Sequence, residues 1–213
     1  MPLSGRFISF EGTEGGGKST QIQILAERLR SMGRVVRSVR EPGGTPLGEE
    51  LRAIVKHSKH PHPMTVEAEL MLMNACRAQL VREVILPALR AGEIVLCDRF
   101  ADSTIAYQGF GREMGWEVVK PVVDLAVGGV WPHRTLLLFV PVEISEERRA
   151  SRDGSGTMGS DRFEGQDRAF FQRVETGFRA IASAEPQRMR VIDASRTVQQ
   201  VSQEIWSVLA EVL

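Results

Sequence analysis

A glycine-rich segment near the start of the chain, residues 12–19, constrains the fold more than any other feature of the sequence. It reads G-x-x-x-x-G-K-S, follows the apolar run at residues 7–10 and precedes a segment of helical spacing from Gln21 to Leu29. A strand, a glycine loop and a helix in that order are typical of a phosphate-binding loop, because glycines let successive N–H groups point at one anion at a helix N-terminus. The segment therefore predicts a nucleoside triphosphate site. The alternative is a plain glycine turn that caps a helix.

The residues of this loop have distinct expected roles. Lys18 is expected to reach the β- and γ-phosphates, and the hydroxyl of Ser19 is expected to bind Mg²⁺. ATP is the expected co-substrate and Mg²⁺ the expected metal. The expected nucleotide-binding residues are Gly12, Thr13, Glu14, Gly15, Gly16, Gly17, Lys18, Ser19 and Thr20.

Apolar runs alternate with helical patterns along the chain. Strands are predicted at residues 7–10, 35–39, 94–97, 135–140 and 189–192, and helices at 18–32, 47–57, 65–90, 116–127, 143–151, 164–184 and 197–212, with Gly33 as a helix C-cap. This alternation indicates a three-layer α/β fold with a mostly parallel sheet of about five strands, covered on both faces. The 213 residues suit a single domain, 1–213.

Composition excludes several classes of function. Lys+Arg and Asp+Glu are both 27, so the basic excess that a nucleic-acid partner normally requires is missing. No window approaches ~18 consecutive apolar residues, so no membrane span is expected, and without a signal peptide a cytoplasmic location is expected. Cys76 and Cys97 lie in apolar runs and are expected to be buried thiols rather than a disulfide or metal ligands.

Two segments have irregular composition. Residues 57–63 contain three histidines and two prolines, which favours a solvated linker over a metal site. Residues 152–162 are rich in glycine and serine, carry Arg152 and Arg162 and follow Arg148 and Arg149. This second segment is interpreted as a lid that closes over phosphates, with an exposed charged loop as the alternative.

Polar residues follow two of the predicted strands. Asp98 and Arg99 come directly after the third strand, and Arg40 follows the second. Ligands of parallel α/β sheets bind at the carboxyl ends of the strands, so these side chains are expected beside the glycine loop. Carboxylate, arginine and phosphate loop in one crevice favour phosphoryl transfer, and no Ser/His/Asp arrangement suggests acyl transfer.

With these motifs taken in order, the chain resembles the thymidylate kinase family in its bacterial form. The motifs are FEGTEGGGKST at residues 10–20, REPGGT at 40–45, CRAQ at 76–79, DRF at 98–100, STIAYQG at 103–109 and DRFE at 161–164. The resemblance covers essentially the whole chain. It implies a P-loop NTPase fold and transfer of the γ-phosphoryl group of ATP to dTMP, giving ADP and dTDP for dTTP synthesis.

The resemblance also implies roles for phosphate-binding residues. Glu14 would reach the nucleotide sugar and its phosphate surroundings. Arg40 and Arg99 would hold the dTMP phosphate, with Asp98 on the metal or its water. The transferring group would be stabilised by Lys18, Arg99 and a lid arginine, since the phosphate loop itself has none. The lid candidates are Arg152 and Arg162.

A further set of implied roles concerns the nucleoside. Arg77 would bind the thymine O4, Thr104 its N3 edge, and Tyr107 would sit against the sugar. The remaining implied substrate residues are Glu41, Pro42, Met73, Ser103 and Gln108, and the Glu41–Pro42 peptide is expected to be cis, which proline permits.

The chain departs from the family pattern at two positions. Met73 stands where the family usually has a phenylalanine that stacks on thymine, which implies looser base packing. Phe100 stands where tyrosine or histidine is frequent. A kinase of another monophosphate such as dUMP or UMP, or of a small hydroxylated metabolite, is therefore the nearest alternative. A P-loop nucleotide switch is a more distant one.

The family forms homodimers through long helices, and residues 65–90 are the candidate segment. Their apolar residues could equally belong to the core of one chain.

Overall fold

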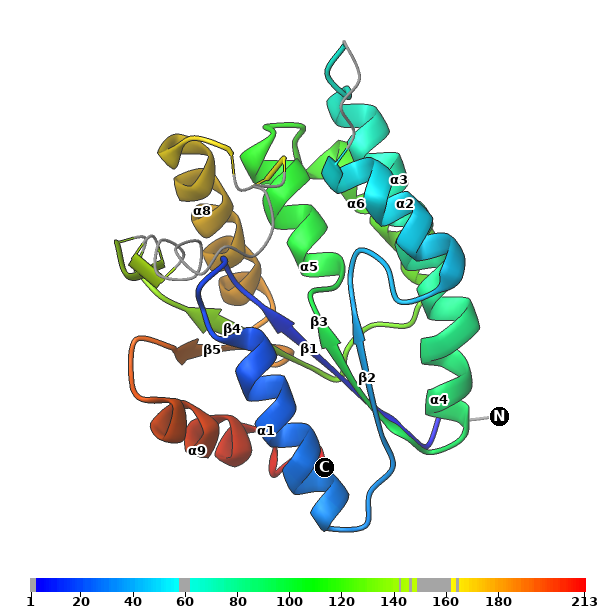
Figure 1. Cartoon of the computed structure of the whole chain (residues 1–213), viewed down its shortest axis with the longest axis vertical. Coiled ribbons are helices and arrows are strands. Elements are labelled where there is room, and N and C mark those ends of the chain that lie inside the picture. The colour runs from blue at the N-terminus through cyan, green and yellow to red at the C-terminus, as the bar shows by residue number, and fades with distance from the viewer. Residues whose placement is uncertain (1–2, 58–61, 142, 146, 149–161, 164) are drawn as a thin grey trace.

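The computed structural model describes residues 3–57, 62–141, 143–145, 147–148, 162–163 and 165–213. Its centre is a sheet of five parallel strands in the order β2-β3-β1-β4-β5 (Figure 1). The strands are β1 (Arg6–Glu11), β2 (Val36–Arg40), β3 (Ile94–Asp98), β4 (Arg134–Phe139) and β5 (Met189–Asp193). All five were expected from their apolar runs, and each prediction is confirmed to within a residue at either end.

Helices cover both faces of this sheet, as the alternation of elements predicts (Figure 1). One face carries α1 (Lys18–Ser31) and α9 (Val198–Leu209), whose apolar side chains pack against Ile8, Phe10 and Leu136. The opposite layer is larger and contains α2 (Pro46–His57), α3 (Val66–Leu80), η1 (Val81–Ile85), α4 (Leu86–Arg90), α5 (Ala101–Thr104), η2 (Ile105–Gly111), α6 (Trp116–Val127) and α8 (Arg168–Ala184). The three-layer α/β prediction is confirmed.

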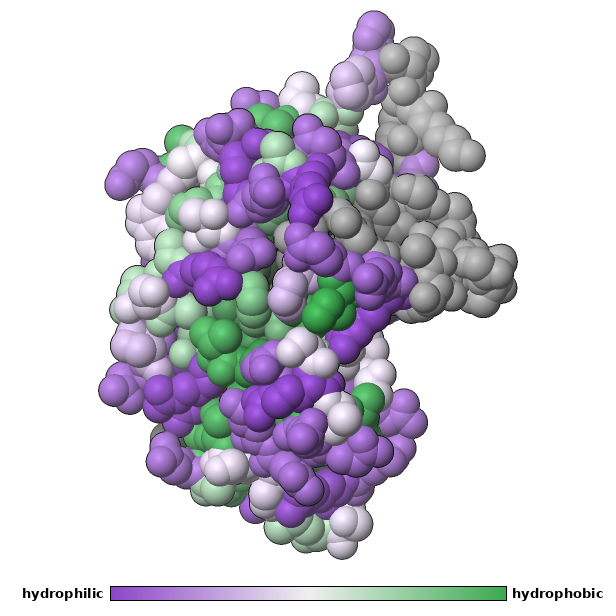
Figure 2. Space-filling model, turned by 90° about the vertical axis from the view of Figure 1, so that its left-hand side faces the viewer, coloured by the Kyte–Doolittle hydropathy of each residue, from purple (hydrophilic) through white to green (hydrophobic). Residues whose placement is uncertain are grey.

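The edge strands differ from the prediction that all strands are covered on both faces. β1, β3 and β4 are buried along nearly their whole length, whereas Arg37 and Ser38 of β2 are exposed. Figure 2 views the molecule from the side on which α8, β5 and α9 lie, and hydrophobic residues gather there at mid-height. β5 forms this edge of the sheet and leaves Val191 52% exposed.

Several helix boundaries differ from those predicted. The segment 65–90 is helical but passes through a π-helical turn, η1, between α3 and α4. α8 begins at Arg168 rather than residue 164, because the Asp167 side chain accepts a hydrogen bond from the Phe170 N–H and caps the helix there. The C-cap of α1 is Met32, and Gly33 follows it with a φ of 78°. Within the predicted helix 143–151, the described residues 143–145 and 147–148 are helical.

The helical run at residues 101–111, formed by α5 and the π-helical η2, is not predicted by the sequence pattern. Gly109 and Gly111 disfavour a helix, so packing must supply its stability. Its partner α8 lies so close that a Cβ at Gly111 would be 2.6 Å from the Phe170 ring. On α8 itself, a Cβ at Gly177 would be 2.8 Å from the Phe110 ring. The glycines therefore serve close helix packing rather than a turn.

The buried thiols agree with the expectation from composition. Cys76 and Cys97 are free and buried, as predicted. Among the described helices, none is both long and apolar enough to cross a membrane. Residues 58–61, the centre of the His/Pro segment, lie outside the described part of the chain.

Candidate active site

The glycine loop joins β1 to α1 and has the backbone that anion binding requires. Gly12 has a φ of 124°, and a Cβ there would lie 2.3 Å from the carbonyl oxygen of Leu138 on β4. Gly17 occupies the N-cap position of α1 in the left-handed conformation and has no side chain to cap the helix. The N–H groups of the first turn of α1 are therefore directed at the loop, where an anion can accept them.

Lys18 is buried and folds back over this loop. Its Nζ donates to the carbonyl oxygens of Gly12 at 3.1 Å and Thr13 at 2.9 Å. Burial and the nearby positive charge of Arg99 together lower the pKa of Lys18 to about 7. A negatively charged ligand in the loop would favour the charged ammonium again.

Ser19 and Asp98 meet beside the loop, as their predicted shared role requires. The Ser19 hydroxyl donates to Oδ2 of Asp98 at 2.9 Å. In the described part of the chain, no group of three or more His, Cys, Asp or Glu side chains is arranged to hold a metal ion. Mg²⁺ bound with phosphates usually takes one or two protein oxygens, so a hydroxyl beside a carboxylate fits it.

The carboxyl ends of β1, β3 and β2 converge as the sequence predicts. The N–H of Arg99 donates to the Phe10 carbonyl oxygen at 2.9 Å, and the N–H of Glu41 donates to the Asp98 carbonyl oxygen at 2.9 Å. Arg99 has a φ of 66°, a left-handed conformation that is unusual for a residue with a side chain. This turn directs its guanidinium back over the loop, where Nη1 donates to the carbonyl oxygen of Gly12 at 3.0 Å.

A cavity of about 740 Å³ opens between the loop and the helices of the larger layer. The predicted residues that line it are Glu14, Gly15, Gly17, Lys18, Ser19, Thr20, Glu41, Pro42, Met73, Asp98, Arg99, Ser103 and Tyr107. Phe163 and Phe171 add apolar walls. The cavity thus extends from the glycine loop to an aromatic end, an arrangement that can accommodate a nucleotide.

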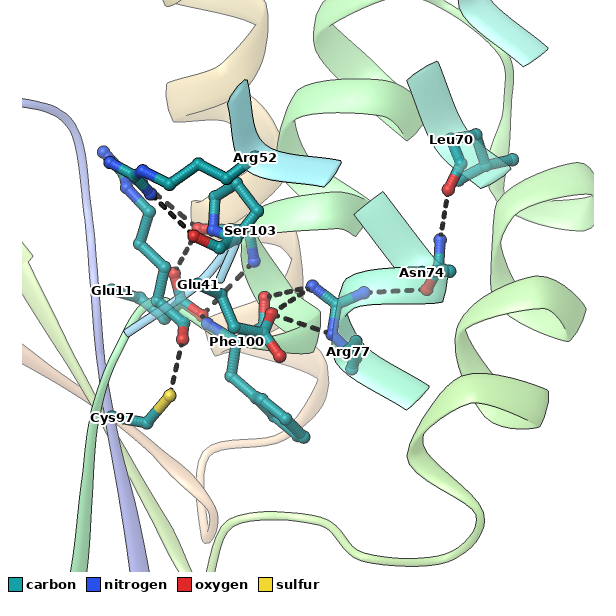
Figure 3. Close-up of polar contacts among 11 residues, drawn as sticks. Glu11, Glu41, Arg52, Leu70, Asn74, Arg77, Cys97, Phe100 and Ser103 are labelled. Atoms are coloured by element: carbon teal, nitrogen blue, oxygen red, sulfur yellow. Dashed lines mark hydrogen bonds and ion pairs between the residues drawn. The ribbon is translucent and has the colours of Figure 1, made fainter. Parts of the chain in front are cut away.

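Arg77 lies buried behind the wall of this cavity (Figure 3). Its Nη2 pairs with Oε2 of Glu41 at 2.6 Å, and its Nη1 donates to the side-chain oxygen of Asn74 at 2.7 Å. The second Glu41 oxygen, Oε1, is buried and has no hydrogen-bond partner among the described residues. Burial raises the pKa of Glu41, and Arg77 opposes this rise. The peptide bond between Glu41 and Pro42 is cis, as expected.

The aromatic end is built around Tyr107 on η2. The Arg99 guanidinium carbon lies 5.2 Å from the centroid of this ring, and Phe163 contacts the ring edge-on at 6.1 Å. Thr104 and Gln108 are fully buried beside it and do not line the cavity. Gln108 donates to Oε1 of Glu69 at 2.9 Å, and the Thr104 hydroxyl has no partner among the described residues.

Of two arginines near the end of β2, the one predicted to bind substrate, Arg40, does not line the cavity, whereas Arg52 does. Arg40 does not line the cavity; its Nη2 donates to Glu49 at 2.9 Å and its Nη1 to the carbonyl oxygen of Pro42 at 3.1 Å. Arg52 on α2 does line it, and its Nη1 donates to the same Pro42 oxygen at 2.7 Å. Sequence reasoning missed Arg52. Its i, i+4 spacing to Lys56, which also lines the cavity, is the signal that could have found it.

The predicted lid arginines are only partly described. Arg152 lies outside the described residues. Arg162 does not line the cavity; its Nη2 pairs with Glu69 at 3.0 Å, and its Nη1 donates to the Val55 carbonyl oxygen at 3.1 Å. Arg148 does line the cavity, and its Nη1 donates to the carbonyl oxygens of Gly15 at 3.1 Å and Ala194 at 3.0 Å.

Comparison with known proteins identifies clear relatives. The sequence profile of the family described as thymidylate kinase matches residues 10–205. A thymidylate kinase from Syntrophotalea carbinolica is 46% identical over 201 residues, which are 94% of this chain and 93% of that protein. A thymidylate kinase from Cupriavidus necator is 44% identical over 212 residues, covering 99% of this chain and 100% of its own length. Another, from Pelotomaculum thermopropionicum, is 45% identical over 211 residues, with 99% and 95% covered.

Proposed function

The chain belongs to the thymidylate kinase family, a family of P-loop nucleoside monophosphate kinases, and we propose how its residues divide the work of transferring a phosphoryl group from ATP to dTMP. The products are ADP and dTDP, the precursor of dTTP. One observation supports these residue roles. A single cavity is lined by the glycine loop and Lys18 at one end and by Tyr107 and Met73 at the other. A donor phosphate and an acceptor nucleoside can then approach each other without water between them.

The donor side consists of the glycine loop, Lys18 and Arg148. The loop amides and the Lys18 ammonium bind the β- and γ-phosphates of ATP, and Glu14 lies at the same end of the cavity. Ser19 and Asp98 would hold a Mg²⁺ ion, which when bound neutralises charge on the phosphates. Arg148 reaches Gly15 from the segment before the lid, and we propose that it joins Lys18 and Arg99 in stabilising the transferring group.

The acceptor side is formed by arginines at the cavity wall. Arg99 and Arg52 line the cavity and bind the dTMP phosphate in our proposal. Arg40 acts indirectly in our proposal. Its hydrogen bonds to Pro42 and Glu49 stabilise the loop that places Glu41 and Pro42 at the cavity. This division revises the direct phosphate contact that the resemblance implies for Arg40.

The thymine end combines an apolar wall with buried polar groups. Met73, Phe163 and Phe171 cover the base in this proposal, and Tyr107 lies against the deoxyribose. Glu41 Oε1 and the Thr104 hydroxyl are buried without partners among the described residues, so both can bind a base edge that reaches them. Arg77, fixed by Glu41 and Asn74, supports this edge and would turn to O4 when the base is bound.

ADP production from ATP and Mg²⁺, measured with dTMP, dUMP, UMP, dCMP, AMP and GMP in turn, tests the acceptor assignment. We expect fast turnover with dTMP and slower turnover with dUMP. Similar rates across the pyrimidines would replace the dTMP assignment with a broader pyrimidine kinase. ADP production that needs no monophosphate would refute the acceptor site. A Lys18→Met control should lower kcat by orders of magnitude with the fold intact.

We propose two further properties of the enzyme, its location and its oligomeric state. The enzyme is placed in the cytoplasm, because ATP and dTMP are intracellular metabolites. It acts as a homodimer through α2, α3 and α6, whose outer faces expose Ile54, Met71 and Leu125.

A further inference from the structure

Glu11 is a buried carboxyl group for which the phosphate loop chemistry gives no role. It ends β1, directly before Gly12, and its relative exposure is 0%. It does not line the cavity, so it cannot touch a bound substrate. Among the described residues no cation lies within ion-pairing distance of it. Burial and the negative charge of Asp102 together raise its pKa to about 8, although the hydrogen bond from Ser103 and the charge of Arg99 oppose the rise. A carboxyl group held in this way depends on hydrogen bonds from its neighbours.

Those hydrogen bonds all come from one segment across the sheet, at the start of the helical run 101–111 (Figure 3). Oε1 of Glu11 accepts from the N–H of Phe100 at 2.7 Å and from the N–H of Ser103 at 3.3 Å. Oε2 accepts from the Ser103 hydroxyl at 2.6 Å. The side chain of Glu11 therefore acts as the cap that this helical run lacks in its own sequence, since Phe100 at its N-cap offers no side-chain acceptor.

Ser103 extends this contact to an arginine of the cavity. Its Oγ accepts a hydrogen bond from Nη1 of Arg99 at 3.2 Å while its proton is donated to Glu11. The same Nη1 donates to the carbonyl oxygen of Gly12. Because a serine hydroxyl has one proton, an acceptor at Glu11 leaves the Ser103 lone pairs for Arg99.

We infer that Glu11 is the positioning residue of the acceptor site: through the Ser103 hydroxyl it orients Arg99, and through two backbone N–H groups it fixes the helical run that carries Thr104 and Tyr107. The inference rests on the proposed role of Arg99 in binding the acceptor phosphate. It predicts that Glu11 affects the monophosphate more than ATP, although it is adjacent in sequence to the ATP-binding loop.

Steady-state kinetics of Glu11→Gln, Ser103→Ala and the double variant test this inference, measured at pH 9, where the Glu11 carboxylate is ionised and accepts the Ser103 proton. Glutamine keeps the shape and one acceptor oxygen, but its NH₂ group faces Ser103 and forces the hydroxyl proton toward Arg99. We expect KM for dTMP to rise about tenfold in each single variant, the size of a lost hydrogen bond to a charged group. KM for ATP should change less than about twofold, because the hydrogen bonds of the Glu11 side chain go to Phe100 and Ser103 and not to the glycine loop. The double variant should be no worse than the poorer single variant, because all three changes break the same chain of contacts.

Thr197→Ala is the matched control. The Thr197 side chain caps α9, in the other helical layer, by accepting a hydrogen bond from the Gln200 N–H at 3.3 Å. Its loss should lower stability without changing either KM, which distinguishes general destabilisation by a lost helix cap from loss of positioning.

Three outcomes would overturn the inference. One is an unchanged KM for dTMP in both single variants when the wild-type enzyme turns over dTMP normally. Another is a parallel rise in both KM values, which would indicate general loosening of the site. The third is a double variant whose effect is the product of the single effects. If Glu11→Gln fails to fold, Ser103→Ala alone decides, because it keeps the two backbone contacts. A wild-type protein that does not phosphorylate dTMP would refute the proposed function and this inference with it.

Discussion

At the scale of single residues, the charge of Lys18 depends on its ligand. Its pKa of about 7 lies well below the ordinary value because the side chain is buried and Arg99 is near. At pH 8 the ligand-free side chain is therefore mostly neutral. The triphosphate of ATP stabilises the ammonium and raises this pKa, so binding takes up a proton.

We expect ATP binding at pH 8 to take up roughly one proton per site. Calorimetric titration in buffers of different ionisation enthalpy measures this number from the slope of heat against buffer enthalpy. Lys18→Met should bind ATP more weakly and lose the uptake. A slope of zero in the wild-type enzyme, or an equal slope in the variant, would contradict the assignment of the proton to Lys18.

Met73 sets the packing against the base. Its side chain is 9% exposed and lines the cavity, where a phenylalanine ring could stack on thymine. Stacked aromatic pairs contribute about 0.5–1.5 kcal/mol beyond burial, so Met73→Phe should lower KM for dTMP roughly two- to tenfold at unchanged kcat. Met32→Phe, at a 58% exposed position on the end of α1, is the control and should change neither constant. A higher KM in Met73→Phe would mean that the cavity is shaped for methionine.

The site residues that the strand pattern predicts are those at strand ends. The positions of the other site residues depend on packing. Asp98 and Arg99 follow an apolar run that identifies β3, so their place beside the loop follows from parallel-sheet geometry. Arg52 lies on α2, and only the packing of that helix determines which of its side chains line the cavity. Thr104 and Gln108 were expected only from the family resemblance, because they lie on a helical run that glycine-rich sequence does not predict. The left-handed backbone of Arg99 has no sequence signal at all.

At the scale of elements, two acidic side chains fix the first turn of the helical run 101–111. Glu11 caps it on one side, and Asp102 pairs on the other with Nη1 and Nη2 of Arg188 at 2.7 Å each. Asp102 is fully buried and the Arg188 side chain is 13% exposed. The run therefore owes its position to two carboxylates rather than to its own helix propensity.

Breaking the second of these anchors should destabilise the protein strongly. Removing one partner of a buried ion pair leaves an uncompensated charge, and we expect Asp102→Asn to lower the free energy of unfolding by about 2–4 kcal/mol. Asp124→Asn is the matched control, because Asp124 pairs with Lys120 on the surface of α6. It should cost less than about 0.5 kcal/mol. Urea denaturation of both variants measures the difference, and equal small costs would show that the buried pair contributes little.

At the scale of the whole molecule, three neighbouring helices of the larger layer each expose apolar side chains, which we propose form one apolar face. α2 exposes Leu47 and Ile54, α3 exposes Met71, and α6 exposes Leu125, which is 77% exposed. These helices lie side by side at the upper right of Figure 1, away from the β5 face of Figure 2. A second copy of the same chain would cover this face, because two such surfaces are self-complementary about a two-fold axis.

Sedimentation velocity tests this proposed dimer. The wild-type protein should sediment at twice the chain mass of 23.6 kDa, and Leu125→Glu should sediment as a monomer because it places a charge in the proposed apolar interface. Val191→Glu, at a 52% exposed position on β5, changes charge equally on another face and should leave the dimer intact. A monomeric wild-type protein, or dissociation by Val191→Glu, would refute the proposed interface.

The position of α3 between the proposed dimer interface and the cavity predicts how the monomeric Leu125→Glu variant changes KM. Met71 faces outward from this helix, while Met73 and Arg77 face the cavity side, so the same helix carries both surfaces. Loss of the partner should loosen α3 and raise KM for dTMP several-fold, whereas the loop and α1, which bind ATP in the proposal, lie in other parts of the fold. A Leu125→Glu monomer with wild-type KM for both substrates would show that each chain forms its acceptor site alone.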